Sequence, residues 1–159
     1  MRDKTMKHIL LRKASLGDLP ILEQLLQELV EAERPFDETL KEGVIHYYPI
    51  KELIESDDAA VLVLEEEDHI VGCGYAQIKP AKPYLRHQTY AHLGFMFVRP
   101  AYRGRGLNQQ LIGELKHWAV SKGTKEIRLE VYAENSSAIK AYEKAGFKKL
   151  LTTMRCEVQ

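Results

Sequence analysis

The sequence is poor in cysteine, and the two that occur are not arranged as metal ligands. Cys73 and Cys156 are the only cysteines in 159 residues, and neither lies in a CxxC or cysteine–histidine spacing. This excludes a disulfide framework and gives no indication of a zinc site. We expect two reduced, buried thiols and no bound metal.

Two further absences narrow the class of protein. Lys and Arg together number 23, as do Asp and Glu, so no net charge attracts nucleic acid or an anionic membrane. The chain has no apolar run of the roughly 18 residues that a membrane span needs, and its N-terminus lacks the apolar core of a signal peptide. We therefore expect one cytoplasmic domain over residues 1–159, with no nucleic-acid or membrane partner.

Apolar residues recur with the periods of helices and strands. Three amphipathic helices are predicted, over residues 19–33, over residues 107–122, and from the N-cap Asn135 to Ala145. Residues 34–58 lack a clean period, so we expect an irregular segment with a short helix near its end. Strands are predicted over residues 8–14, 59–65, 69–78, 88–98, 126–132 and 147–158.

This order of elements predicts an α/β fold with one mixed sheet and helices on both of its faces. The strand over residues 88–98 is the longest alternating segment. Alternation places one set of side chains on one face, namely Thr89, Ala91, Leu93, Phe95 and Phe97. The other face receives Tyr90, His92, Gly94, Met96 and Val98.

The segment VRPAYRGRGLNQQLI, residues 98–112, joins this strand to the next helix through a turn that contains Gly104 and Gly106. A strand followed by such a turn and a helix directs free backbone amides at an anion such as a pyrophosphate. The nucleotide fingerprints do not fit: GxxxxGK[ST] is absent, and Gln109 replaces the third glycine of GxGxxG. On these residues alone, a flexible connection with two solvated arginines is an equal alternative.

A second segment, NSSAIKAYEKAGF over residues 135–147, resembles the closing motif of the GNAT superfamily of N-acetyltransferases. Residues 98–112 resemble the acetyl-coenzyme A turn of the same family, and the resemblance covers most of the chain. It implies a GNAT-like fold, with a central, mostly antiparallel sheet. It also implies direct transfer of an acetyl group from acetyl-coenzyme A to a primary amine of a small molecule or peptide, without a metal.

The resemblance implies three sets of coenzyme-binding residues. The family's turn, [Q/R]-x-x-G-x-[G/A], corresponds to Arg103, Gly104, Arg105, Gly106, Leu107 and Asn108, and only Asn108 departs from it. The backbone of Met96, Phe97 and Val98 is expected to pair with the pantetheine arm as a strand would. Asn135 is expected to touch the coenzyme, although an N-cap role alone would also explain it.

Acetyl transfer needs a base for the amine and an acid for the departing thiolate. Tyr142 matches the family's tyrosine that protonates the sulfur, and a core aromatic residue is the alternative. His92 occupies the strand position where some family branches carry a carboxylate, so it is the expected base, with a structural histidine as an equal alternative. Further candidates for the base are Glu130, Glu31 and Glu33.

Two questions stay open at the level of sequence. A non-catalytic module that binds or senses acyl-coenzyme A on the same fold is the alternative to an enzyme, and a homodimer is an alternative to a monomer. The acceptor is not readable, because the segments expected to frame it carry opposite charges. Acidic residues that favour a cationic amine are Glu31, Glu33, Asp37 and Glu38, whereas basic residues that favour an anionic acceptor are Lys79, Lys82, Arg86 and His87.

Overall fold

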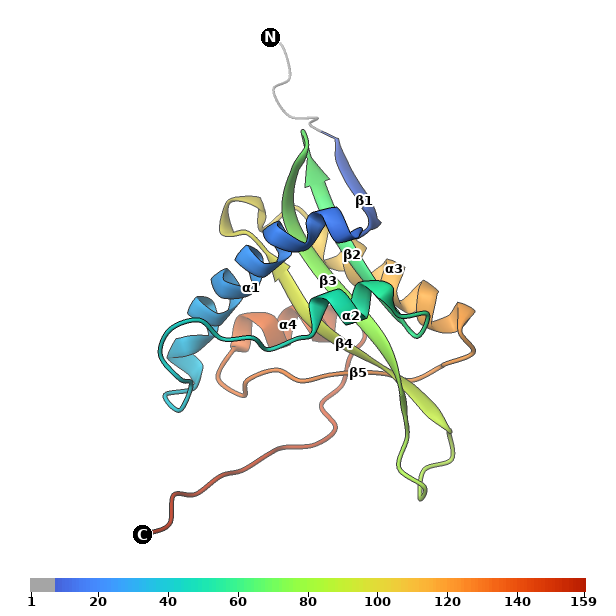
Figure 1. Cartoon of the computed structure of the whole chain (residues 1–159). Coiled ribbons are helices and arrows are strands. Elements are labelled where there is room, and N and C mark those ends of the chain that lie inside the picture. Colours follow the sequence, from blue (N-terminus) through green and yellow to red (C-terminus); the bar gives the residue numbers. More distant parts are fainter. Residues whose placement is uncertain (1–7) are drawn as a thin grey trace.

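The computed structural model describes residues 8–159, and a five-stranded sheet lies at its centre (Figure 1). The strands are β1 (Ile9–Lys13), β2 (Ala59–Glu66), β3 (His69–Pro80), β4 (Thr89–Val98) and β5 (Ile127–Leu129). They are arranged in sequence order, with antiparallel pairing from β1 to β4 and parallel pairing of β4 with β5. The predicted mixed, mostly antiparallel sheet is confirmed.

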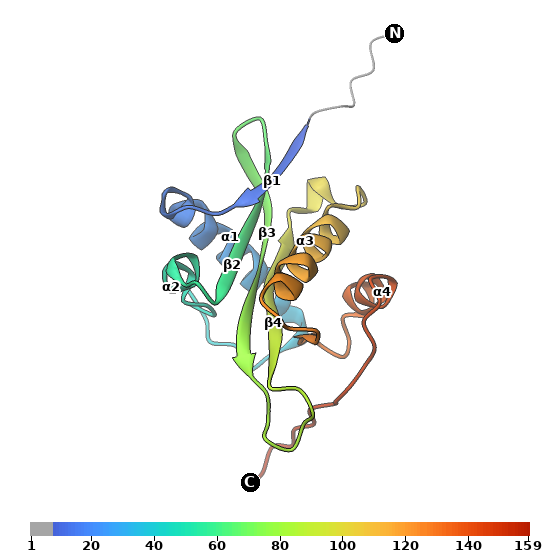
Figure 2. The same ribbon diagram turned by 90° about the vertical axis from the view of Figure 1, so that its right-hand side faces the viewer.

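Helices cover both faces of this sheet, as predicted. They are α1 (Leu19–Glu33), α2 (Ile50–Glu55), α3 (Leu107–Ser121) and α4 (Ser136–Lys144), with 3₁₀ turns η1 (Leu16–Asp18), η2 (Arg34–Phe36) and η3 (Pro100–Tyr102). Figure 2 shows α1 and α2 on one side of the sheet and α3 and α4 on the other. Each face therefore has its own apolar core, one built on α1 leucines such as Leu22 and Leu26, the other on α3 leucines such as Leu111 and Leu115.

The β2–β3 hairpin closes without a glycine. Glu67 and Asp68 form its two-residue loop, and their φ angles of 48° and 65° are both positive. Positive φ at both central positions is what a type I′ turn requires, and this turn matches the twist of the flanking strands. The predicted hairpin is confirmed.

A bulge in β4 overturns the predicted alternation of its side chains. Cys73 pairs with Phe97 and Tyr75 pairs with Gly94, so β4 holds one more residue than β3 between these pairs. Phe95 has a φ of 54°, and it packs with Phe97 against the α1 face. The extra residue exchanges the two faces of the strand beyond Gly94.

His92 and the end of β4 consequently lie on opposite faces of the sheet. Met96 and Val98 pack on the α3 face. His92 pairs with Gln77 in the register of Tyr75, whose ring packs on the α1 face. The predicted shared face of His92, Met96 and Val98 is therefore wrong.

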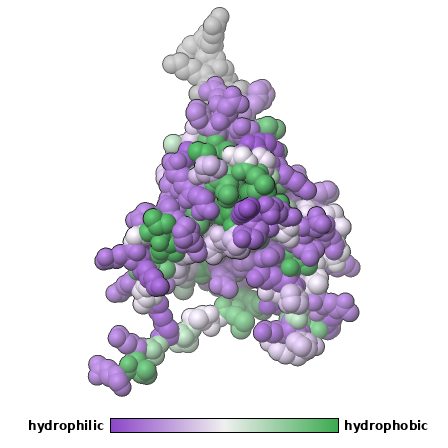
Figure 3. All heavy atoms as spheres, in the orientation of Figure 1, coloured by the Kyte–Doolittle hydropathy of each residue, from purple (hydrophilic) through white to green (hydrophobic). Residues whose placement is uncertain are grey.

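The predicted strand over residues 147–158 is also wrong. This segment has no regular structure, and its large apolar side chains Leu150, Leu151, Met154 and Val158 are 67–89% exposed. In Figure 3 the segment extends away from the body of the protein, with hydrophobic residues along it. A strand requires the edge of another strand, and β5, at three residues instead of the predicted seven, provides little edge.

The same segment corrects the expectation for the cysteines. Cys73 on β3 is a buried free thiol, as predicted, whereas Cys156 is a free thiol exposed to solvent. Burial raises the pKa of the Cys73 thiol well above its usual value, so this sulfur stays protonated.

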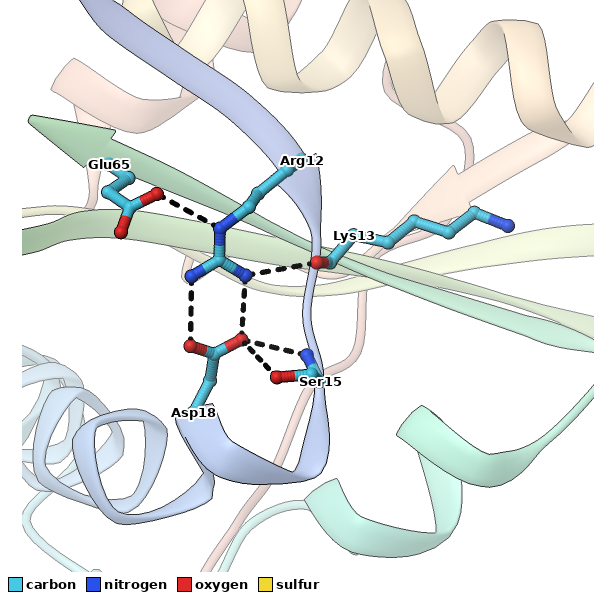
Figure 4. A network of polar contacts seen from close by, with 5 residues as sticks. All are labelled: Arg12, Lys13, Ser15, Asp18 and Glu65. Atoms are coloured by element: carbon cyan, nitrogen blue, oxygen red, sulfur yellow. Dashed lines mark hydrogen bonds and ion pairs between the residues drawn. The ribbon is translucent and has the colours of Figure 1, made fainter. Parts of the chain in front are cut away.

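Arg12 fastens the edge strand β1 to its neighbours (Figure 4). Its guanidinium donates to the Asp18 carboxylate at 2.8 and 2.9 Å and to Glu65 on β2 at 3.0 Å. Asp18 occupies the predicted N-cap position of α1, but its carboxylate accepts from Arg12 and from the Ser15 amide and makes no cap hydrogen bond to α1. These contacts lower the pKa of Asp18 to about 2, with the Arg12 hydrogen bond as the main cause.

Candidate active site

A cavity of about 200 Å³ opens where β4 and β5 separate. The two strands pair only between residues 91–93 and 127–129. Beyond these pairs the cavity is lined by the end of α1, the β4 bulge, the residues after β5 and one side chain of α4. The cavity therefore joins segments that are far apart in the sequence, and its polar side chains are Glu33, Tyr48, His92, Glu130 and Tyr142.

Tyr142 reaches this cavity from α4. Its ring lies edge-on to Phe147, with 5.8 Å between the centroids. Burial raises the pKa of Tyr142 to about 12, and the nearby Glu33 charge adds to the effect. Within residues 8–159 the hydroxyl forms no hydrogen bond, so at neutral pH it holds a proton that it can donate into the cavity.

His92 lies on the wall formed by β4. Its ring centroid is 6.1 Å from that of Tyr75. Burial lowers the pKa of His92 below its usual 6.5, the charge of Lys79 lowers it further, and Glu130 opposes both effects. The imidazole is therefore mainly neutral at pH 7 and able to accept a proton.

Of the three glutamates that are further candidates for the base, two line the cavity and one does not. Glu33, at the end of α1, and Glu130, after β5, both line the cavity. Burial raises the pKa of Glu33 above its usual 4.5. Glu31 is exposed and forms an ion pair with Arg34 at 2.8 Å, away from the cavity.

Tyr48 is a cavity residue that the sequence does not single out. It comes from the irregular segment before α2, and its ring stacks on Phe95 at 5.5 Å and meets Tyr75 edge-on at 5.3 Å. Burial raises its pKa, while the Phe95 backbone amide opposes the shift. The adjacent aromatics Tyr47 and Tyr48 are the available signal, but without a period nothing in the sequence indicates which way they face.

The turn that contains Gly104 and Gly106 lies directly before α3, in the connection from β4. Gly104 and Gly106 have φ angles of 79° and 75°, and a Cβ added at either position would meet no atom within 4 Å. The turn thus needs glycine for its left-handed backbone rather than for space. Within the described part of the chain, the N–H groups of residues 104–109 donate no hydrogen bond, which leaves a row of donors at the start of α3.

The two arginines of this turn both contact the protein. Arg103 donates from Nε to the Val98 carbonyl at 3.0 Å, with its guanidinium 5.8 Å from the Phe97 ring centroid. Arg105 pairs with Glu66 at 3.3 Å, and this carboxylate is only 5% exposed. These contacts hold the two side chains against the ends of β4 and β2, and both arginines also remain exposed to solvent.

The remaining predicted coenzyme residues have defined places. Leu107 is buried and anchors the first turn of α3, while Asn108 is partly exposed in the same turn, where its backbone is not left-handed. Asn108, in place of the family's glycine or alanine, therefore causes no backbone strain. The Asn135 side-chain oxygen Oδ1 accepts from the Ala138 amide at 3.2 Å, which confirms the N-cap. Gln109 donates to the Ala141 carbonyl at 3.0 Å and so joins α3 to α4.

Residues 8–159 contain neither a metal-binding cluster nor a membrane-spanning helix. No group of three or more His, Cys, Asp or Glu side chains in this part of the chain is placed to hold a metal ion. None of the helices described is both long and apolar enough to cross a membrane.

Comparison with known proteins assigns the family. The family described as acetyltransferase (GNAT) matches residues 22–147. The chain belongs to the GNAT acetyltransferase family. This GNAT chain is 26% identical over 102 residues to aminoglycoside N(6′)-acetyltransferase type 1 of Salmonella typhimurium, a match that covers 62% of the chain and 69% of that enzyme.

Two other relatives differ in how much of their length the GNAT chain spans. It is 24% identical over 155 residues to thialysine N-epsilon-acetyltransferase of Bos taurus, covering 91% of the chain and 87% of the relative. It is 45% identical over 53 residues to the uncharacterized protein ML0378 of Mycobacterium leprae, covering 33% of the chain and only 14% of that protein.

Solved structures share the fold of this GNAT chain. A mutant of the BH1408 protein from Bacillus halodurans superimposes with a TM-score of 0.82 at 18% identity, covering 94% of the chain and 99% of the other protein. The enzyme AAC(6′)-Iy, in complex with the bisubstrate analog CoA-S-monomethyl-acetylneamine, gives a TM-score of 0.73 at 20% identity, covering 96% and 99%. The five-stranded sheet with helices on both faces is therefore the GNAT fold.

Proposed function

We propose that the chain is an N-acetyltransferase that moves an acetyl group from acetyl-coenzyme A directly to a primary amine. The observation that carries the proposal is the cavity between β4 and β5, where the unpartnered Tyr142 hydroxyl and the neutral His92 imidazole face one space. One group can give a proton and the other can take one, as aminolysis of a thioester requires.

The residues present fit coenzyme A. The unpaired amides of residues 104–109, at the positive end of the α3 dipole, suit a pyrophosphate. The backbone of Met96 to Val98 borders the opening beyond the last β4–β5 pair, where it can pair with the amides of an extended arm. Coenzyme A, when bound, supplies the acetyl group as an activated thioester. The related AAC(6′)-Iy complex holds a coenzyme A analog on the same fold.

In the proposed mechanism, His92 accepts a proton from the acceptor amine, directly or through a water molecule, because an ammonium cannot act as a nucleophile. Tyr142 donates its phenolic proton from Oη to the leaving sulfur. Its raised pKa keeps this proton in place until negative charge develops nearby. No residue of the chain is acylated in this scheme.

Replacing Tyr142 by Phe tests the proposal against a non-catalytic coenzyme-binding module. The substitution removes one oxygen and keeps the ring beside Phe147, so folding and coenzyme affinity should hardly change. We expect kcat to fall by about 10²–10⁴-fold, the range of general-acid assistance. The measurement is coenzyme A release across amino acids, polyamines, aminoglycosides and peptides.

Full kcat in Tyr142→Phe, with acetyl transfer rate-limiting, would make the acid assignment wrong. A wild-type protein that binds acetyl-coenzyme A but releases no coenzyme A with any of these amines would instead be the binding or sensing module.

We further propose that the protein is a cytoplasmic, single-domain homodimer. Both cysteines are free thiols, which suits a reducing compartment. Residues 148–158 leave four large apolar side chains exposed. The even positions of this segment carry Leu150, Thr152, Met154, Cys156 and Val158, whereas the odd positions from 153 carry Thr153, Arg155 and Glu157. This period of two is that of a strand without a partner, and the occupant we propose is a second copy of the chain.

A further inference from the structure

We propose that the acceptor carries a second positive charge, and that Glu33 binds this charge within a wall of tyrosine rings. The inference rests on the proposed transferase function and names its substrate class: amines with two cationic groups.

The cavity has negative and no positive side chains. Its lining includes the carboxylates Glu33 and Glu130 and no lysine or arginine. Among residues 8–159 the Glu33 carboxylate forms neither a hydrogen bond nor an ion pair, although it is only partly exposed. A partly buried carboxylate without a partner attracts a cation more strongly than a carboxylate on the open surface, because solvent screens it less.

Two arginines with contacts close to Glu33 in the sequence, Arg34 and Arg155, are paired with other carboxylates. The guanidinium of Arg34 binds the Glu31 carboxylate and donates to the carbonyls of Lys41 and Gly43, each at 2.8 Å. Arg155, from the C-terminal segment, pairs with Asp37 at 3.0 Å. Neither charge neutralises Glu33, so the partner that the carboxylate lacks has to come from outside this part of the chain.

Tyrosines from three segments lie near this carboxylate, and two of them, Tyr48 and Tyr142, line the cavity together with Glu33. The Glu33 charge contributes to raising the pKa of each of Tyr47, Tyr48, Tyr132 and Tyr142, which places all four within electrostatic reach of it. Tyr47 and Tyr48 meet edge-on at 5.7 Å, and Tyr132 stacks on Phe36 at 5.9 Å.

Aromatic faces around a carboxylate form a typical site for an ammonium group, because the ring quadrupoles and the charge attract it together. Tyr48 and Tyr142, which line the cavity with Glu33, are the tyrosines that such a group would meet.

The basic residues that favoured an anionic acceptor lie away from this site. Lys82, Arg86 and His87 belong to the loop between β3 and β4, which projects beyond the sheet in Figure 1, and none of them lines the cavity. His87 lies 2.8 Å from Glu126. Of the basic set, only Lys79 influences a cavity residue, through the pKa of His92.

Three five-carbon amines of matched length test the inference: pentane-1,5-diamine, 5-aminopentan-1-ol and 5-aminopentanoate. We expect kcat/KM to fall in this order, with the diamine about 10–100-fold above the aminoalcohol through a lower KM. In Glu33→Gln the diamine preference should shrink to within about threefold. The matched control is Glu31→Gln, two residues earlier in α1 on the exposed surface. This variant should keep the full preference.

Equal kcat/KM for the diamine and the aminoalcohol in the wild type would overturn the inference while leaving the transferase function intact. Calorimetric binding of pentane-1,5-diamine to the coenzyme A complex gives a readout that needs no turnover. A tenfold or larger loss of affinity in Glu33→Gln supports the inference, and unchanged affinity overturns it. Melting temperatures exclude misfolding as the cause, because Gln removes a carboxylate that burial disfavours and should not lower the Tm.

Discussion

At the scale of single residues, the proposed mechanism depends on one imidazole kept neutral and one phenol kept protonated. Burial lowers the pKa of His92 and raises that of Tyr142, since it disfavours the charged form of each. The family motif predicts both residues, because they lie in segments with a recognisable pattern. It could not predict Tyr48 or rank Glu33 above Glu31, because no spacing in residues 31–48 indicates which side chains turn toward β4.

The pH dependence of the rate follows from the His92 shift. Because its pKa lies below 6.5, the base form is already dominant at pH 7, so the contribution of His92 to kcat/KM should be lost only as the pH drops through that lower pKa. His92→Ala should lose this acid limb and about 10²–10⁴ of the rate. The pH–rate profiles of the wild type and the variant should be measured with the same amine. The ionisation of the amine then affects both profiles equally, and the difference between them reports on His92. An identical acid limb in the variant would assign His92 a structural role.

At the scale of elements, sequence periodicity places α1 and the start of α3 correctly but fails within β4. Leu19 to Glu33 and Leu107 onward keep one apolar stripe each, and both helices begin where predicted. The alternation in β4 breaks at Phe95, because the bulge exists only in the pairing with β3. A pattern within one strand contains no information about the register of its neighbour.

The turn before α3 offers a test with a matched control on the same helix. Acetyl-coenzyme A at millimolar concentration should raise the wild-type Tm, as any ligand selective for the folded state does. Gly106→Glu should abolish this shift, because it places negative charge among the free amides. It should also lower the ligand-free Tm by several degrees, because φ at this position is 75°.

Gly113→Glu is the control for this substitution. Gly113 is exposed in α3 with ordinary helical backbone and open space around it, so glutamate adds the same charge and improves helix propensity. Its ligand-free Tm should rise slightly, and the ligand-induced shift should remain. A ligand-induced shift preserved in Gly106→Glu would remove the turn from the proposed coenzyme site.

At the scale of the whole molecule, the layers of the fold follow from the sequence but the end of the chain does not. Residues 147–158 alternate like a strand, yet they pair with neither edge strand of the described sheet, and β5 offers only three residues for pairing. Hydrophobic alternation indicates that a strand will form, and it does not indicate whose sheet the strand joins.

Light scattering after size-exclusion chromatography tests whether a second copy covers this segment. We expect a mass of twice 18.3 kDa at micromolar concentration. Met154→Asp, on the alternating apolar positions, should shift the protein toward the monomer, while Thr153→Asp should not. A wild-type protein that remains monomeric at all concentrations tested would contradict the homodimer.

The short β4–β5 pairing also means that two parts of the protein differ in the free energy needed to unfold them locally. From β1 to β4 every strand is held by long ladders, whereas β5 contributes three pairs and α4 has no fully buried residue. Local unfolding of residues 127–147 therefore costs less free energy than unfolding of the whole chain, and backbone amides there exchange with solvent sooner. Since the cavity lies along this seam, a ligand that touches both sides slows that exchange most strongly in the segment that is weakest without it.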